Sequence, residues 1–145
     1  MNKFIVAGVA SGVFLLLVIG ISLLPGQTGN PTSEAPGEVV AQSGLHWHAT
    51  LKVTSKGELI KIPANIGLGA VHNPIHTHDD EPGLIHMEFG GVVTSEDLVL
   101  GKFFEVWGRP FEPEGSVTMT VNGKPNEEFG RYMMRDGDVI EVIYQ

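Results

Sequence analysis

Residues 45–54 alternate polar and apolar side chains at every position. Histidine, threonine and lysine occupy one set of positions, and apolar residues occupy the other. Because successive side chains of a β-strand point to opposite faces, this period of two predicts a strand with one buried face and one polar face. A chain with such a strand must build a sheet over a hydrophobic core. The polar face of this strand begins with two histidines, His46 and His48.

Further patterns predict the rest of the architecture. Residues 75–79 and 84–89 flank a turn-rich stretch and predict a hairpin, and Asn122-Gly123 is a second hairpin signal. Thr94 or Ser95 can cap a helix that carries large apolar side chains at helical spacing up to Trp107. Residues 129–134 and 138–144 predict additional strands. The predicted fold class of the domain is α+β, with a mainly antiparallel β-sheet and one helix.

Residues 4–24 form a stretch without a charged side chain. At about 1.5 Å per residue, a helix of this length can cross the roughly 30 Å hydrocarbon core of a membrane. Lys3 precedes the stretch and no basic cluster follows closely, which favours a cytoplasmic amino terminus and an extracytoplasmic remainder. Residues 1–24 are therefore predicted to be a single-pass transmembrane anchor at the cell membrane, with a cleaved signal peptide as the alternative. The full prediction is the α+β domain preceded by this single N-terminal transmembrane helix.

The remaining composition sets the domain boundaries and excludes several partners. Residues 25–44 are rich in Pro, Gly, Ser, Thr and Glu and predict a flexible linker, whereas residues 45–145 suffice for one domain with one core. The net charge is -8 and lysine or arginine clusters are absent from the sequence, so no nucleic-acid partner is expected. The sequence contains no cysteine, which excludes disulfides and thiolate metal sites.

All six histidines lie between residues 46 and 86, and five of them fall in alternating patterns. Residues two apart on a strand share a face, so each H-x-H pair can present two imidazoles to one ion. The register of the hairpin around Pro82 decides which imidazoles meet: an odd loop places His86 and Glu88 on the face of His76 and His78, and an even loop does not. The alternative is that each ring is a hydrogen-bonded structural residue. The predicted metal ligands are His46, His48, His76, His78, His86 and Glu88.

Imidazole and carboxylate ligands suit copper, zinc or iron better than calcium or magnesium. The predicted extracytoplasmic location and four methionines of the domain favour copper, although core packing also explains each methionine. The predicted function is a membrane-tethered, extracytoplasmic metal-binding protein that binds or handles copper. Two alternatives stay open: a mononuclear zinc or iron metalloenzyme with Glu88 as general base, and a structural accessory subunit with a membrane-protein partner.

Two resemblances add to this interpretation. The first depends on the order of six motifs, which are His46-x-His48, His76-Thr77-His78-Asp79, Ile85-His86-x-Glu88, Leu100-Gly101-x-Phe103-Phe104, Asn122-Gly123-Lys124 and Asp136-Gly137-Asp138-x-Ile140. This order resembles a group of uncharacterised, membrane-anchored, extracytoplasmic proteins of archaea and bacteria, which implies the domain boundaries but no activity. The last two motifs are also similar to the closing part of β-grasp sulfur carriers. Those carriers act through a terminal Gly-Gly, and this sequence ends in Ile143-Tyr144-Gln145.

Overall fold

The computed structural model describes residues 37–109, 111 and 116–145, which contain nine strands, one α-helix and two 3₁₀ helices. The helix α1 spans Leu100–Trp107, and the 3₁₀ helices span Ser95–Leu98 and Phe129–Arg131. The strands are β1 (Val39–Ala41), β2 (Leu45–Ser55), β3 (Glu58–Ile60), β4 (Ile75–His76), β5 (Leu84–Phe89), β6 (Val93–Thr94), β7 (Val117–Val121), β8 (Lys124–Pro125) and β9 (Asp138–Tyr144).

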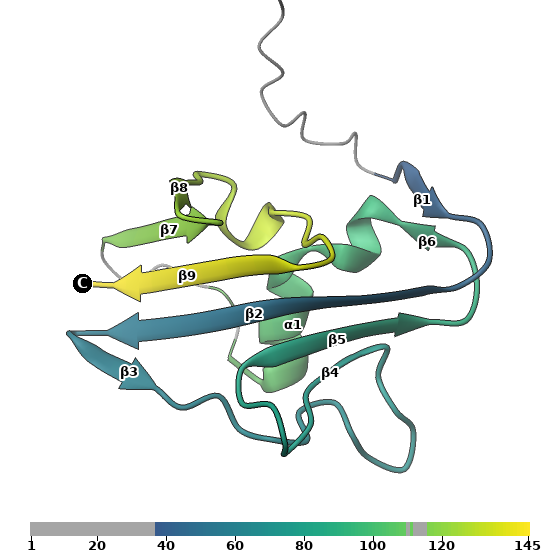
Figure 1. Cartoon of the computed structure of the whole chain (residues 1–145), viewed down its shortest axis with the longest axis horizontal. Helices are drawn as coiled ribbons and strands as arrows, with labels where there is room; N and C mark the ends of the chain where they lie inside the picture. Colours follow the sequence, from purple (N-terminus) through teal and green to yellow (C-terminus); the bar gives the residue numbers. More distant parts are fainter. Residues whose placement is uncertain (1–36, 110, 112–115) are drawn as a thin grey trace, which may run out of the picture. The chain divides into compact units, whose positions relative to one another are not determined.

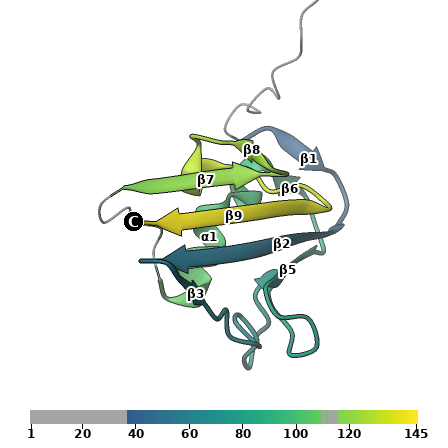
Figure 2. The same cartoon turned by 60° about the vertical axis from the view of Figure 1, so that its left-hand side comes forward.

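Seven of these strands form one sheet in the order β4-β5-β2-β9-β7-β8, with β3 paired to the far end of β2 (Figures 1 and 2). The central neighbours β2 and β9 run parallel, and the other paired strands of this sheet are antiparallel. The short strands β1 and β6 pair separately. The long strand β2 therefore links the β4–β5 hairpin to the carboxyl-terminal strands.

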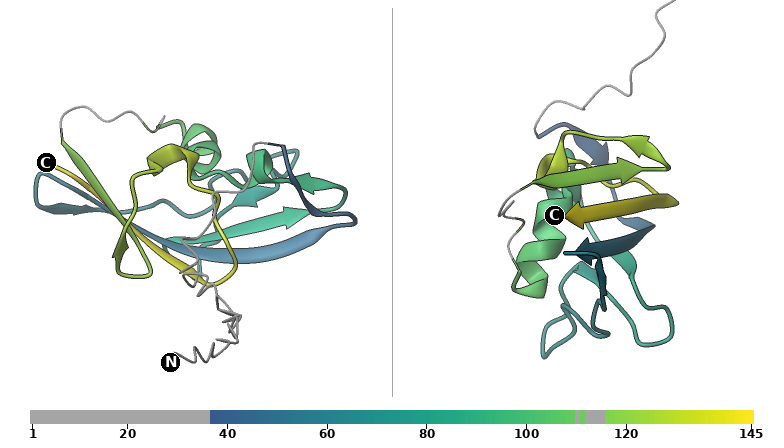
Figure 3. Two further views of the ribbon diagram at one scale, coloured as in Figure 1. Left: turned by 90° about the horizontal axis from the view of Figure 1, so that it is seen from above. Right: turned by 90° about the vertical axis from the view of Figure 1, so that its left-hand side faces the viewer.

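The two faces of the sheet have different roles. Figure 3 shows α1 on one face of the sheet, and the buried residues of the helix are Leu100, Phe103 and Phe104. The apolar positions of β2 contribute to the same core through Ala49, Leu51 and Val53. Because side chains alternate along β2, its histidines point away from this core. The face opposite α1 is therefore the one that presents the imidazoles.

The prediction of a membrane-spanning helix is corrected. No helix among the residues that the structure describes is long and apolar enough to cross a membrane. The segment on which that prediction depended, residues 1–24, lies outside the described residues, as does most of the predicted linker. The described residues have the fold class α+β. The extracytoplasmic location stays a prediction from the sequence.

Three local predictions also differ from the structure. The strand β1 lies within residues 25–44, which were expected to form a linker, because it pairs with β6. The helix expected up to Trp107 is interrupted at Val99, where backbone hydrogen bonds join Leu100 N to Tyr132 O and Met134 N to Leu98 O. Those tertiary bonds hold Val99 in an extended conformation. Of the strand expected over residues 129–134, Phe129–Arg131 form a 3₁₀ helix and Met133 makes an isolated β-bridge to Val99.

Candidate metal centre

Three histidines form a row across the adjacent strands β2, β5 and β4. His48 lies directly opposite His86, and His86 lies directly opposite His76. Side chains of directly paired residues project from the same face of a sheet and contact one another. The hairpin thus has the register of the odd-loop alternative, which brings the imidazoles of all three strands together.

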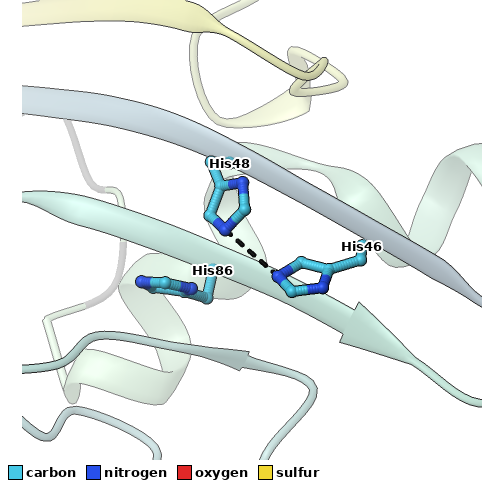
Figure 4. A group of neighbouring side chains, drawn as sticks. All are labelled: His46, His48 and His86. Carbon is cyan, nitrogen blue, oxygen red and sulfur yellow. Dashed lines mark hydrogen bonds between the residues drawn. The ribbon is translucent and has the colours of Figure 1, made fainter.

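A fourth histidine and a carboxylate extend this row along β2 and β5. His46 lies two residues before His48 and directly opposite Glu88. The Nε2 atoms of His46 and His48 are 3.1 Å apart (Figure 4). His46 Nε2 is also 3.2 Å from Glu88 Oε1. We call His46, His48 and His86 the first histidine group, whose possible ligand atoms lie within 4.8 Å of one another.

The second histidine group consists of His76, His78 and His86 and meets the same distance limit. The Nε2 atoms of His76 and His78 are 3.2 Å apart. The ring of His86 stacks on that of His76, with centroids 5.4 Å apart, and meets the ring of His78 edge to face at 4.6 Å. The two groups share His86, so five of the predicted ligands form one continuous cluster.

The nitrogen separations match those of ligands on a common ion. Metal–nitrogen bonds of about 2.0–2.1 Å in tetrahedral geometry place neighbouring ligand atoms about 3.3 Å apart. The two Nε2–Nε2 distances, 3.1 and 3.2 Å, are close to this value. Each H-x-H pair can therefore act as a two-nitrogen clamp after small side-chain movements.

Neighbouring groups favour tautomers that leave Nε2 available. His76 Nδ1 donates a hydrogen bond to the carbonyl oxygen of Asn73 at 3.1 Å, since a carbonyl can only accept. The carboxylate of Asp136 lies 3.9 Å from His48 Nδ1 and accepts a 2.9 Å hydrogen bond from the His48 backbone N–H. A carbonyl or carboxylate partner on the other ring nitrogen is typical of histidines that bind metal ions.

His86 is the histidine that the two groups share. Its side chain is 12% exposed, and both ring nitrogens are buried without a hydrogen-bond partner among the described residues. Burial, followed by repulsion from His48, His78 and His76, lowers the pKa of His86 below 6.5, and Glu88 opposes this shift. The ring is therefore neutral near physiological pH, which is the form that binds metal ions.

Thr77 anchors the segment that carries His76 and His78. Its side chain is 1% exposed because it points into the protein, opposite to the two histidines. The hydroxyl donates to Pro63 O at 3.0 Å and accepts from Ile66 N at 3.1 Å, and two further backbone bonds join Thr77 to residues 65 and 66. These bonds hold the second histidine group in place beyond the end of β4.

We expect Thr77→Val to lower the free energy of unfolding by about 1–3 kcal/mol, because it removes the hydroxyl that pairs with Pro63 O and Ile66 N and leaves both unpaired. Urea denaturation measures this loss. Thr118→Val is the matched control, since Thr118 is exposed on β7, and it should change stability by less than about 0.5 kcal/mol. Equal effects of the two substitutions would show that the Thr77 hydroxyl does not anchor this segment.

Glycine is required where the loop after His78 enters β5. Gly83 has φ +83°, and its carbonyl oxygen accepts a 2.8 Å hydrogen bond from Leu51 N. A Cβ atom at this position would lie 2.8 Å from the carbonyl oxygen of Leu51. This close approach of the backbones fixes β5, and with it His86, against β2.

The remaining sequence candidates lie elsewhere or have other roles. His72 is exposed and belongs to neither histidine group within the described part of the chain. The four methionines that favoured copper are buried in the core, which removes thioether ligands from the interpretation; they are Met87, Met119, Met133 and Met134. Sequence reasoning missed Glu81, whose Oε2 lies 3.9 Å from His86 Nε2, and Asp136, which is 88 residues from its partner His48.

Comparisons with protein-family models, curated proteins and solved structures give no significant match to this chain. The functional argument therefore depends on the geometry of the histidine cluster. The fold and the site together define an α+β domain with histidine groups that can hold a metal ion.

Proposed function

We propose that this protein binds a transition-metal ion, copper above all, through the two histidine groups. The observation that supports the proposal is the convergence of five imidazoles from the β2, β4 and β5 segments, with neighbouring Nε2 atoms 3.1 and 3.2 Å apart. Imidazole is the commonest protein ligand for such ions. A strand register that aligns three histidines across three strands supplies this convergence.

The energetics of the metal-free cluster support the same function. A buried structural histidine normally has hydrogen-bond partners, and a buried polar atom without one costs about 1–3 kcal/mol. Both nitrogens of His86 lack such a partner among the described residues. Neighbouring imidazoles also repel one another when protonated. Metal binding by His86 and the neighbouring imidazoles would lower both costs.

The ligand chemistry favours copper in the Cu(II) state. The cluster offers imidazole nitrogens and the carboxylate of Glu88. Among divalent first-row ions such sites bind Cu(II) most tightly, and soft thiolate or thioether ligands are what Cu(I) prefers. Since the sequence has no cysteine and the four methionines of the domain are buried in its core, Cu(II) fits better than Cu(I). Zinc is the competing ion in the experiment below.

The exposure of the first histidine group favours a second candidate function, that of a mononuclear metalloenzyme. The side chains of His46 and Glu88 are 60% and 45% exposed. An ion held there would have a side open to water, with the Glu88 carboxylate beside it as a general base. Exchange of a bound water, measured by magnetic resonance on the copper-loaded protein, separates this function from binding in a closed site.

Titration of the untagged full chain with Cu(II), in the presence of a weak competing ligand, tests the proposed function. The double substitution His48→Ala/His78→Ala removes one ligand from each group and should weaken binding at least about 100-fold, because outer partners alone contribute 10–100-fold. His72→Ala is the matched control and should bind as the unaltered protein does. Unchanged affinity in the double variant, with the fold intact by circular dichroism, would refute the proposal.

A further inference from the structure

The proposed function leaves open how many ions the cluster holds. We propose that it holds two, with the imidazole of His86 as a bridging ligand between them. This inference rests on the proposed function and deepens it. Its starting observation is that the first and second histidine groups each contain two histidines of their own and have only His86 in common.

The two ring nitrogens of His86 face different partners. Nδ1 lies 3.9 Å from Glu88 Oε1, and the same Glu88 oxygen lies 3.2 Å from His46 Nε2. Nε2 lies 3.9 Å from Glu81 Oε2. Figure 4 shows one nitrogen of His86 facing His46 and His48 and the other pointing away from them. The two nitrogens are therefore directed to different sides, Nδ1 to Glu88 beside the first histidine group and Nε2 to Glu81.

A single ion does not satisfy this arrangement. The two nitrogens of an imidazole diverge, so one ion can bind only one of them. The other nitrogen of His86 would stay buried, and among the described residues it has no hydrogen-bond partner. Buried polar atoms without partners cost free energy, and two ions, one at each nitrogen, leave no such atom on His86.

Each histidine group also borders its own surface hollow. One hollow is lined by Gly44, Leu45, His46, Glu88, Phe89 and Gly90. The other is lined by residues of the 61–64 segment together with His78, Asp79 and Pro82. An ion can thus reach either group without passing the other. The carboxylates of Glu88 and Asp79 would attract cations to these two places.

The proton and charge balance of the bridge is simple. A neutral imidazole carries one N–H proton and one free lone pair. When both nitrogens of His86 bind ions, this proton is released to the solvent and the ring becomes an imidazolate with one negative charge. The charge is offset by the two divalent ions on either side. No electron transfer and no further reactant are needed.

The test uses the untagged full chain loaded with Cu(II), measured by elemental analysis and electron paramagnetic resonance. We expect two copper ions per chain. Because unpaired electrons couple antiferromagnetically through an imidazolate, the resonance signal should be much smaller than that of two isolated Cu(II) ions. Loading with one equivalent each of copper and zinc should restore the full signal of one copper.

Matched variants identify the two positions. His46→Ala/His48→Ala and His76→Ala/His78→Ala each remove one group, and each should reduce the content to one uncoupled copper per chain. One uncoupled copper per unaltered chain would overturn the two-ion inference and leave the proposed function intact. Two uncoupled coppers would overturn the bridge. No bound copper at all would refute the proposed function itself.

Discussion

Replacing His86 with leucine is expected to make the metal-free protein more stable and to prevent metal binding at both histidine groups. The imidazole of His86 buries two nitrogens that have no hydrogen-bond partner among the described residues, and leucine would place an apolar side chain of similar size in this space. Removal of one buried, unpaired polar atom raises the free energy of unfolding by about 1–3 kcal/mol. Function would be lost because each histidine group needs a nitrogen of this ring. A residue that lowers stability is often one that serves binding.

The gain in stability should depend on pH with a definite sign. The pKa of His86 in the folded protein lies below 6.5, mainly because of burial and then because of the neighbouring histidines. As the pH falls below 6.5, the unfolded chain therefore binds more protons at this position than the folded chain does. The free energy of unfolding decreases on acidification through this window and recovers as the pH rises. Leucine does not titrate, so its advantage should grow as the pH falls.

Urea denaturation in the presence of a chelator measures the gain in stability and its dependence on pH. The two pH values, about 7.5 and about 5.5, lie on either side of an ordinary histidine pKa. His72→Leu is the matched control, because His72 is exposed and outside both groups, and it should stay within about 0.5 kcal/mol of the unaltered protein. A loss of stability in His86→Leu at both pH values would mean that the imidazole is favourably bound in the metal-free protein.

Much of this site could be predicted from local patterns. The period of two around His46 and His48 identifies the strand and the face that carries the histidines, and the predicted strand over residues 84–89 matches β5. These predictions succeed because alternation is a property of neighbouring residues. The H-x-H spacing then places two imidazoles on one side wherever the backbone is extended.

The positions that local patterns could not predict depend on long-range pairing. The parallel register of β2 and β9 places Asp138 opposite Ala49, and this brings Asp136 to the backbone of His48. No local pattern relates residues so far apart in the chain. The interruption of the predicted helix at Val99 has the same origin, because its neighbours bond to residues 132 and 134. Tertiary contacts here outweigh helix propensity.

Asp136 and Gly137 form a turn that is hydrogen-bonded to the backbone of His48. The buried carboxylate of Asp138, which is 5% exposed, stabilises this turn. Asp138 Oδ2 accepts hydrogen bonds from the hydroxyl of Tyr132 at 2.7 Å and from the backbone N–H of Arg135 at 2.8 Å. Asp138 Oδ1 accepts from the Asn122 amide at 2.9 Å. Burial first, and then the bond to Asp138, raise the pKa of Tyr132 far above its usual range, so this hydroxyl stays a donor. The carboxylate thereby fixes the start of β9.

We expect Asp138→Ala to lower the free energy of unfolding by at least about 3 kcal/mol, since each hydrogen bond to a charged group contributes about 1.5–3 kcal/mol. Asp138→Asn should lose less, because its amide oxygen still accepts. Glu141→Gln is the control on the same strand; its carboxylate pairs with Lys52 at the surface, and the loss should stay below about 1 kcal/mol. Urea denaturation measures all three.

Asp138→Ala should also weaken metal binding, but only at the first histidine group, which contains His48. Gly137 N donates to His48 O at 2.8 Å, and Asp136 accepts from His48 N, so the turn orients the first histidine group. Loss of such supporting contacts weakens metal affinity by about 10–100-fold. Copper titration of folded Asp138→Ala should therefore show weaker binding at the first group, whereas Thr77 keeps the second group in place. Equal weakening of both groups would mean that the loss is one of general stability and not of orientation.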